Sequence, residues 1–471
     1  MFNIKRVWVL GALVSMLMAA CGENPSSPPI GSAAVATEAE SAPLAWAAPG
    51  KRADLLEAVT TWNDHIATFS RLALVPPPRE ARMAAMANTT VHDVLNAVKR
   101  RYEGYAYTGS VSEPLLVEAA VATGAHDVLA SVGTGLAPGN TAPAFIAQSY
   151  ATYMATLPDG VEKTRGVELG RAAAAAMIAL RANDNSVGPF AVPYTSTGEP
   201  GKFRPLIPPS NTGLSGQVAI PHWATVRPFV MTSPSQFRAP PPYGAATVQA
   251  AVQTPQYLAD YAEVKAYGGV VSAVRTPDQA DIGFFWVGSS IQGWNEAARV
   301  IGRQRQLGAW KLARLLAHVH LAQADSYIAT FDNKFFDLFW RPVTAIRLGN
   351  LDPGTPGDPA WNVMTSAVAA IGGTPPVPEY NSSHAAAGGA SGTAIMGNVP
   401  GRIAFSMTSG TSQTGKPRAW GSVDEAIREN SDSRVYVGFH FRHATEIGEA
   451  QGRAIGRWVL EHSLAKVGDE D

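Results

Sequence analysis

Apolar positions recur every three or four residues along most of this chain. That spacing places them on one face of an α-helix, and it predicts helices wherever it is sustained. The predicted helices span residues 53–74, 79–105, 112–133, 144–156, 160–182, 248–266, 278–305, 309–330 and 423–467, the last of them with breaks. Strand-like alternation of apolar and polar residues is scarce, so the pattern predicts an all-α fold built from helical bundles.

One long segment departs from the helical pattern. Residues 190–243 are dense in proline, glycine and aromatic residues and show neither helical nor alternating periodicity. A connection of this length is unusual as a free loop. We expect it to form an ordered crossover that wraps the bundle and shapes the mouth of a pocket.

Composition narrows the choice of partners. The 471 residues are 46% hydrophobic and 16% charged, with a formal net charge of −1. These values are ordinary for a globular protein. Nucleic-acid-binding domains, in contrast, usually carry a positively charged surface formed by clustered lysine and arginine residues. The sequence contains no basic run with interleaved aromatic residues, so no nucleic-acid partner is expected.

The chain opens with the features of an export signal. Lys5 and Arg6 precede an apolar stretch over residues 7–18, and the segment LMAAC ends at Cys21, the single cysteine of the chain. This arrangement is typical of a secretory signal, and LMAAC resembles the lipobox of bacterial lipoproteins. We expect residues 1–20 to be a signal peptide, 21–50 a lipidated, disordered tether attached through Cys21, and 51–471 one catalytic domain. An ordinary cleaved signal with an incidental cysteine is the alternative.

The expected membrane contact is therefore a lipid. After the signal, no stretch of the sequence approaches the ~20 apolar residues that cross a bilayer. Gly22 follows the cysteine, which favours sorting to the outer membrane, so the expected location is the cell envelope, facing the periplasm or the exterior. A homo-oligomer is compatible with the sequence, which does not specify one.

Five basic side chains in the C-terminal third carry the candidate chemistry. They are Lys334 and Arg341 in KFFDLFWRP, His384 in PEYNSSHA, and Arg434 with His440 in SRVYVGFHFR. Three lasting cations and two imidazoles suit a tetrahedral oxyanion such as phosphate or vanadate. The sequence contains no GxSxG, Walker or HExxH motif, so it does not indicate a serine hydrolase, a P-loop nucleotide site or a zinc site.

Local patterns indicate how these side chains meet. Lys334 and Arg341 lie seven positions apart, so on one continuous helix they would share a face, and Pro342 would end or kink that helix. Asn381 or Ser382 is a candidate N-cap for a following helix of small residues. The first-turn amides of such a helix attract an anion.

Arg434 and His440 need a different backbone. Six positions apart, they would lie about 240° from one another on an ideal helix. They converge if the backbone between them is extended or broken, which Gly438 permits. Each residue taken singly is more simply interpreted as a surface charge or a core histidine, and their combination is what indicates a site.

Together the three segments resemble the signature of the vanadium-dependent haloperoxidases and of the related type 2 phosphatidic acid phosphatases and bacterial acid phosphatases. That signature runs Lys, six residues, Arg-Pro; then Pro-Ser-Gly-His; then Arg, five residues, His. The first and third spacings match in full. The segments FWRPVTAIR, RTPDQADIGFFW and GWNEAAR also resemble the bacterial haloperoxidase branch, and the resemblance covers about residues 53–464.

The resemblance implies an all-helical fold with two four-helix bundles and a vanadate cofactor. His440 would bond the metal through a ring nitrogen, and His384 would be the acid–base residue. The rest of the vanadate-binding set would be Lys334, Arg341, Ser382, Ser383 and Arg434. The implied activity is that of a peroxidase, an oxidoreductase that uses hydrogen peroxide to oxidise halide to a hypohalous-acid equivalent, which halogenates a small organic acceptor.

Three positions qualify the resemblance. Asn381 replaces the motif proline, and Ser383 replaces the motif glycine and adds bulk where the anion meets the backbone. Val377, seven positions before His384, stands where some characterised haloperoxidases carry an aromatic residue or a histidine. A small apolar residue there favours bromide or iodide over chloride.

Two other functions fit the same residues. In an acid phosphatase, His440 would attack phosphorus to form a phosphohistidine, and His384 would protonate the leaving alcohol. The altered NSSH motif motivates the third interpretation, a non-catalytic oxyanion-binding lipoprotein.

Overall fold

The computed structural model describes residues 52–205, 216–349, 355–368 and 373–468, which belong to one compact unit. The predicted signal peptide, the tether and Cys21 lie outside the described residues. None of the helices in the described ranges combines the length and the apolar character that crossing a bilayer requires.

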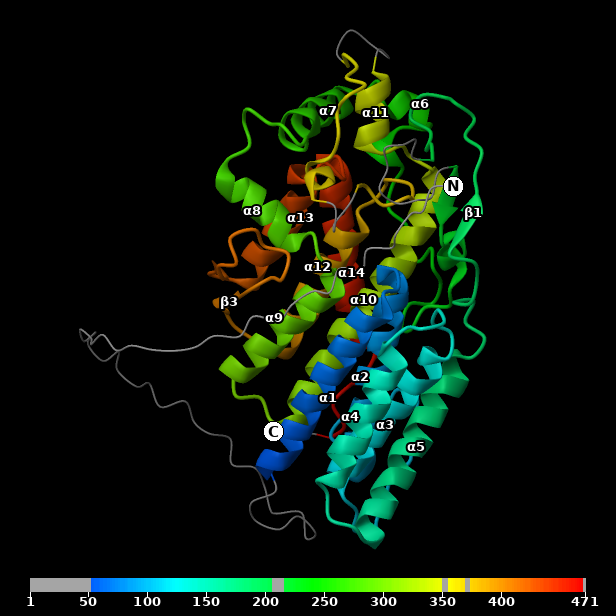
Figure 1. The fold of residues 1–471 in the computed structure, drawn as a ribbon, viewed down its shortest axis with the longest axis vertical. Helices are drawn as coiled ribbons and strands as arrows, with labels where there is room; N and C mark the ends of the chain where they lie inside the picture. The colour runs from blue at the N-terminus through cyan, green and yellow to red at the C-terminus, as the bar shows by residue number, and fades with distance from the viewer. Residues whose placement is uncertain (1–51, 206–215, 350–354, 369–372, 469–471) are drawn as a thin grey trace, which may run out of the picture. The chain divides into compact units, whose positions relative to one another are not determined.

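The described residues are mainly helical, as predicted (Figure 1). The helices are α1 (Arg52–Ala73), α2 (Pro77–Val98), α3 (Val117–Gly133), α4 (Ala142–Ala155), α5 (Val161–Arg181), α6 (Val248–Ala251), α7 (Pro255–Tyr267), α8 (Pro277–Trp286), α9 (Ser290–Gln304), α10 (Ala309–Asp337), α11 (Pro342–Leu348), α12 (Ser383–Asn398), α13 (Val423–Tyr436) and α14 (Arg442–His462). Two short antiparallel pairs join β1 (Ala191–Pro193) to β2 (Gln217–Ala219) and β3 (Phe405–Met407) to β4 (Arg418–Trp420).

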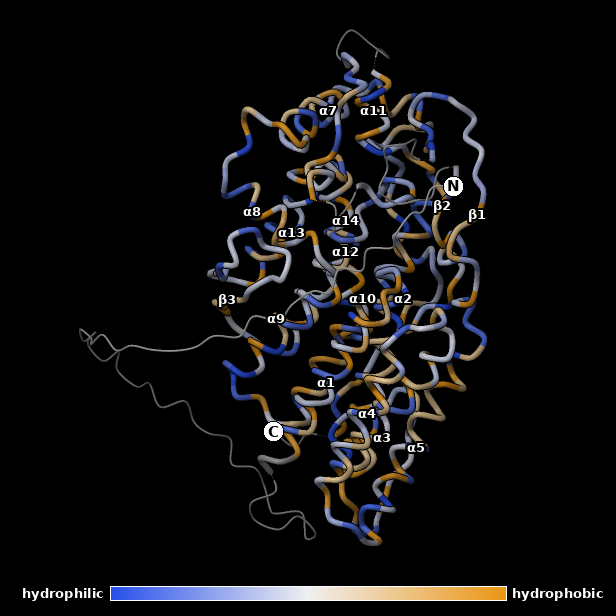
Figure 2. The backbone as a smooth tube through the Cα atoms, viewed as in Figure 1, coloured by the Kyte–Doolittle hydropathy of each residue, from blue (hydrophilic) through white to orange (hydrophobic). Residues whose placement is uncertain are grey.

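Two groups of helices share the long helix α10. The first group is α1 to α5, in which α3 packs against α1, α2, α4 and α5, and α2 also packs along α10. The second group is α9, α10, α12, α13 and α14, with α8 against α13 (Figure 1). Hydrophobic and hydrophilic residues are mixed along the helices (Figure 2), and α2, α10 and α12 are buried along most of their length.

Two predicted helices are each divided in the structure. The segment predicted as 278–305 forms α8 and α9, because the Ser289 side chain accepts the Gln292 amide and caps a new helix. The segment predicted as 248–266 forms α6 and α7, and the Thr254 side chain accepts the Tyr257 amide at the start of α7. Such caps compete with continuation of a helix, although the apolar periodicity runs through both.

Helix α12 packs unusually closely against α14, because glycines on α14 face its backbone. A Cβ atom on Gly452 would lie 2.0 Å from the Ala386 carbonyl oxygen, and one on Gly448 would lie 2.5 Å from that of Ser382. Only glycine permits this approach. The close packing fixes the start of α12 relative to the second bundle.

The crossover that begins near residue 190 is ordered in its described parts. The buried Asp325 carboxylate on α10 accepts the backbone amides of Phe229, Val230 and Met231, at 2.6, 2.8 and 2.8 Å. Further along, the Tyr380 hydroxyl donates to the Pro240 carbonyl at 2.8 Å. The crossover is therefore attached both to α10 and to the segment that precedes α12.

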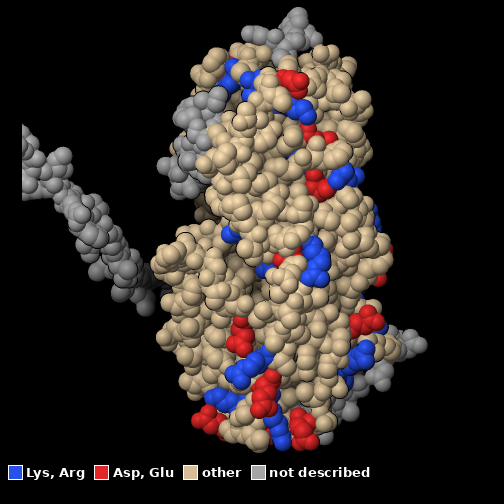
Figure 3. All heavy atoms as spheres, turned by 90° about the vertical axis from the view of Figure 1, so that its right-hand side faces the viewer, with Lys and Arg blue, Asp and Glu red and all other residues tan. Residues whose placement is uncertain are grey.

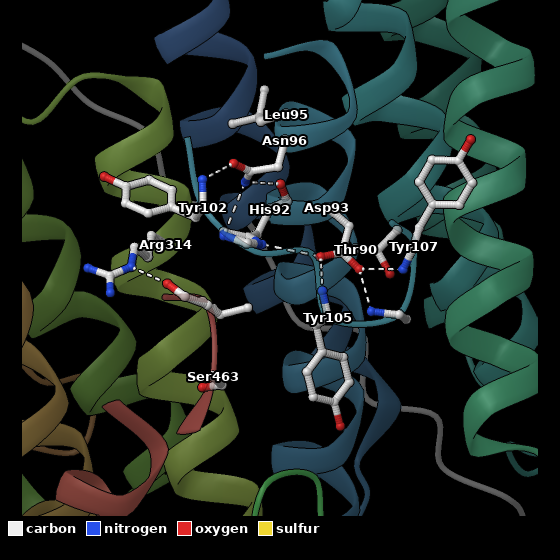
Figure 4. Close-up of polar contacts among 12 residues, drawn as sticks. Thr90, His92, Asp93, Leu95, Asn96, Tyr102, Tyr105, Tyr107, Arg314 and Ser463 are labelled. Carbon is white, nitrogen blue, oxygen red and sulfur yellow. Dashed lines mark hydrogen bonds and ion pairs between the residues drawn. The ribbon is translucent and has the colours of Figure 1, made fainter. Parts of the chain in front are cut away.

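The connection after α2 is fixed in a similar way (Figure 4). Asp93 accepts the backbone amides of Tyr105, Ala106 and Tyr107 at 2.8 to 2.9 Å, and Asn96 accepts the amide of Tyr102 at 2.8 Å. Side chains of the last turns of α2 thus satisfy the amides of the chain that leaves it, as buried backbone groups require.

Candidate functional site

Lys334 lies in the last turn of α10 and is buried. Its ammonium group donates to the carbonyl oxygens of Pro378, Glu379 and Asn381, at 3.1, 2.8 and 2.6 Å. Burial and the neighbouring Arg341 hold the pKa of Lys334 well below its ordinary value, while Glu379 opposes that shift. Lys334 therefore holds the segment before α12 against the end of α10.

Arg341 does not share a helix with Lys334, so the prediction of one common helix face is wrong. Helix α10 ends at Asp337, Leu338 adopts left-handed backbone angles, and Arg341 is the extended N-cap residue of α11. Pro342 begins α11 and does not end α10. The cause is tertiary, since the crossover donates the Phe203 amide to the Leu338 carbonyl at 2.7 Å.

The guanidinium of Arg341 nevertheless reaches the same place. It donates from Nε to the Val377 carbonyl at 2.8 Å and from Nη1 to the Phe439 carbonyl at 3.1 Å. The Nη1 atom also lies 3.4 Å from Nε2 of His440. Burial lowers the pKa of Arg341 to about 10, against the raising effect of Glu379.

The predicted helix of small residues is α12, and Ser382 is its N-cap. The Ser382 hydroxyl oxygen accepts the Ala385 amide at 3.3 Å. Ser383 begins the helix, and its hydroxyl is hydrogen-bonded to that of Thr330 on α10 at 2.8 Å. The Asn381 side chain donates to Gln451 on α14 at 3.0 Å. First-turn amides have no partner within a helix, so this terminus offers donors to an anion.

His384 follows in the first turn of α12 and is partly buried. Its Nε2 atom is buried without a hydrogen-bond partner. Burial, followed by the charge of Arg434, holds the pKa of His384 well below its ordinary value. The imidazole is thus neutral near pH 7 and able to accept a proton.

The backbone between Arg434 and His440 is broken, as their convergence would require. Helix α13 ends at Tyr436, Gly438 has φ +80°, and the amides of Phe439 and His440 both donate to the Arg434 carbonyl. Arg434 donates to the Trp286 carbonyl at 3.4 Å, and its buried Nε has no partner. Burial lowers the pKa of Arg434 to about 9.

The structure adds a residue that the sequence did not single out. Glu379 is fully buried, and its Oε1 atom lies 2.9 Å from Nδ1 of His440 and accepts the Phe441 amide at 3.1 Å. Burial raises the pKa of Glu379 to about 8, while Lys334 and Arg341 oppose that rise. Its signal in the sequence was a single carboxylate within an otherwise uncharged motif, five positions before His384.

The acidic residues near the motif helices do not brace the basic side chains. Asp278 and Asp281 pair with Arg418, and Asp332 pairs with Arg238. Asp325 binds the crossover amides described above. Among the described residues, Glu379 is the one carboxylate within ion-pair distance of the five basic side chains.

The basic cluster, defined as Lys334, Arg341, His384, Arg434 and His440, is brought together from three separate segments. Burial, followed by Arg341, Lys334, Arg434 and His384, holds the pKa of His440 well below its ordinary value. On the surface drawn in Figure 3, basic and acidic side chains are interspersed, whereas the cluster has three cationic side chains beside a single carboxyl group, Glu379, whose raised pKa reduces its negative charge near pH 7. Buried charge of one sign requires a partner.

A tetrahedral oxyanion such as vanadate fits this arrangement. The cluster has a surplus of positive charge, and Arg434 Nε and His384 Nε2 are buried donors or acceptors without partners. A neutral imidazole is also a good metal ligand, and His440 provides one next to Arg341.

Comparison with known proteins agrees with the helical fold. Residues 314–469, which contain all five basic side chains, match the model of the VCPO second helical-bundle domain. A 204-residue segment is 28% identical to the vanadium chloroperoxidase of Curvularia inaequalis, and it covers 35% of this chain and 33% of that protein. The match therefore spans about a third of the length of that relative.

Solved structures extend the likeness in fold to most of the chain. A structure described as the first bacterial vanadium-dependent iodoperoxidase superposes with a TM-score of 0.69 at 20% identity, covering 88% of this chain and 98% of that one. A holo-type bacterial vanadium-dependent chloroperoxidase gives a TM-score of 0.64 at 17% identity, covering 83% and 93%. This chain is thus similar to vanadium-dependent haloperoxidases, in sequence through its second helical bundle and in fold through most of its length.

Proposed function

We propose that this protein binds vanadate in the basic cluster and uses hydrogen peroxide to oxidise halide, producing a hypohalous-acid equivalent that halogenates a small organic acceptor. The observation that carries the proposal is the buried surplus of positive charge around a neutral His440, whose pKa is held low. The match of residues 314–469 to the VCPO second helical-bundle domain supports vanadate over other oxyanions.

Each residue of the cluster has a role that its surroundings support. His440 would hold the metal through Nε2, because Nδ1 is engaged with Glu379. Lys334, Arg341 and Arg434 would balance the negative charge of the oxygens. When bound, vanadate would supply Lewis-acid activation of hydrogen peroxide.

The start of α12 would complete the site. The Ser382 hydroxyl and the Ser383 amide would donate to the anion, since Ser382 caps the helix through its oxygen and keeps its proton available. His384 would transfer protons through the unpartnered Nε2, because its lowered pKa leaves that atom free to accept. A histidine positioned within reach of the reacting group is the commonest general acid or base.

For the halide, we propose bromide or iodide over chloride. Val377 is small and apolar, and its carbonyl is held by Arg341 at 2.8 Å. The likeness in fold to a bacterial iodoperoxidase is compatible with this preference. Competition between the three halides in one assay, with each product quantified, tests it directly. A higher rate with chloride would contradict it.

The central test compares halogenation with phosphoester hydrolysis. The chain without its first 20 residues is assayed with orthovanadate, hydrogen peroxide and bromide or iodide on a phenol dye. In parallel, phosphomonoester hydrolysis is measured without vanadate. We expect halogenation that His440→Ala abolishes and that His443→Gln, which changes a histidine in the first turn of α14, retains. Hydrolysis inhibited by vanadate, with no halogenation, would instead identify a phosphatase.

We also propose that the protein is exported and anchored in the cell envelope through a lipid on Cys21, facing the periplasm or the exterior. The LMAAC segment and the absence of any other cysteine support this assignment. Incorporation of labelled fatty acid by the wild-type chain, and its loss in Cys21→Ala, would be the expected result. Equal incorporation in both would contradict it.

A further inference from the structure

We propose that Glu379 is a positioning residue, which holds His440 in the tautomer that presents an unprotonated Nε2 to the bound oxyanion. The identity of that oxyanion rests on the function proposed above. The tautomer itself does not, because it follows from the contacts of the chain alone.

The first contact lies on the Nδ1 side of the ring. Oε1 of Glu379 is 2.9 Å from Nδ1 of His440, and the same oxygen accepts the backbone amide of Phe441 at 3.1 Å. The oxygen therefore already acts as an acceptor from the backbone next to the ring. If Nδ1 of His440 carries a proton, Oε1 of Glu379 can accept a second hydrogen bond, from that nitrogen.

The second contact lies on the Nε2 side and points to the same tautomer. Nε2 of His440 is 3.4 Å from Nη1 of Arg341. A guanidinium has donors and no acceptor, so the ring nitrogen that faces it must accept. In a neutral imidazole only one nitrogen carries a proton, and that proton is therefore on Nδ1.

The backbone of Glu379 ties this pair to the rest of the cluster. The Glu379 amide donates to the Phe339 carbonyl at 2.9 Å, and its carbonyl accepts from Lys334 at 2.8 Å. One residue thus sets the position of an ammonium through its main chain and of an imidazole through its side chain. A fully buried carboxylate is costly, and this arrangement gives it a function.

Two substitutions separate the hydrogen bond from the charge. Glu379→Gln keeps an oxygen that can accept from Nδ1 and from Phe441 but cannot ionise. Glu379→Leu removes both. Glu80→Gln is the matched control, since Glu80 is another buried carboxylate and accepts hydrogen bonds from Ser289 and Gln292 outside the cluster. Thermal unfolding of all three variants monitors their folding.

Two measurements decide the proposal. Protein labelled with ¹⁵N-histidine and free of ligand reports which ring nitrogen of His440 carries the proton at neutral pH, with His440→Gln used to assign the signal. Titration with orthovanadate gives the dissociation constant. We expect a proton on Nδ1 in the wild type and in Glu379→Gln, with affinities within about threefold. In Glu379→Leu only the Arg341 contact remains to favour a proton on Nδ1, so the share of His440 protonated on Nε2 should rise, and affinity should fall about 10- to 100-fold, as for other partners of metal ligands.

Several outcomes would overturn the assignment. A wild-type His440 with its proton on Nε2 would do so regardless of whether any variant folds. Wild-type behaviour of Glu379→Leu in both measurements would also do so. If Glu379→Gln lost as much orthovanadate affinity as Glu379→Leu, the loss would be due to the ionised carboxylate and not to the hydrogen bond. If the tautomer depends on Glu379 but the wild type does not bind vanadate, the positioning role stands and the proposed function fails.

Discussion

At the scale of single residues, the two departures from the family motif are accommodated by partners on neighbouring helices. The Asn381 side chain donates to Gln451, and the Ser383 hydroxyl is hydrogen-bonded to Thr330. Both side chains are thus engaged with the walls of the bundle. The main-chain carbonyl of Asn381 still accepts from Lys334. The altered residues therefore leave the backbone contacts of the motif in place.

The substitution Asn381→Ala should destabilise the fold without weakening anion binding. It leaves a buried oxygen of Gln451 without its donor, which costs about 1–3 kcal/mol. Urea unfolding should show that loss. The orthovanadate dissociation constant should change less than about twofold, because the main-chain contact of residue 381 with Lys334 is kept; a tenfold change would need a loss of about 1.4 kcal/mol in binding free energy. A double-mutant cycle with Gln451→Met checks the cause. Additive losses in that cycle would contradict the assigned contact.

The residues of the basic cluster could be chosen from the sequence because each lies in a recognisable local frame. Glu379 could not, because its partner His440 is 61 positions away and the contact exists only after the chain has folded. A carboxylate near a motif carries no sign of the distant group that it will meet.

At the scale of elements, helix existence was easier to predict than helix ends. Apolar periodicity identified the long helices, but the end of α10 depends on tertiary contacts. Leu338 is held by the crossover amide of Phe203, and the next residues continue as extended backbone to Arg341. The apolar periodicity of the α10 segment contains no information about the crossover, which is distant in sequence.

The contact between α12 and α14 gives a prediction at this scale. In Gly452→Ala the new Cβ would meet the Ala386 carbonyl at 2.0 Å, so the helices must separate. We expect a loss of at least 3 kcal/mol in unfolding free energy, near the upper end of the usual cost of overpacking. Gly293→Ala in α9 is the control, because its Cβ would meet the nearest side chain at 3.8 Å. It should be neutral or stabilising by up to about 1 kcal/mol. Equal effects in urea unfolding would refute the explanation.

At the scale of the whole molecule, the all-α class followed from the periodicity, but the way in which the two helix groups share α10 did not. That helix carries Asp325 toward the crossover, Lys334 toward the cluster and buried histidines toward its other neighbours. His318 lies 3.1 Å from the Ser463 carbonyl, and His320 lies 2.9 Å from the Asn295 side chain. These polar contacts join segments that are distant in sequence, so only the folded chain reveals them.

The buried histidines predict how stability depends on pH. Burial lowers the pKa of His318 to about 3 and that of His320 to about 4. Below the ordinary value of 6.5 the unfolded chain therefore binds protons that the folded chain excludes. Stability from these groups is complete above about pH 6.5 and falls by about 2 kcal/mol for each by pH 5.

Urea unfolding across this range checks the prediction, and His320→Gln should reduce the slope. A slope unchanged by that substitution would show that other groups are responsible.

The unbalanced positive charge of the basic cluster has a consequence for the physiology of the protein. Any small oxyanion that binds only the folded chain stabilises it by mass action, by about 2.7 kcal/mol at one hundred times its dissociation constant. Phosphate would then protect the fold and, at the same time, compete with vanadate for the same donors. The phosphate supply of the surroundings would decide how much of the protein is both intact and available for the proposed vanadate cofactor.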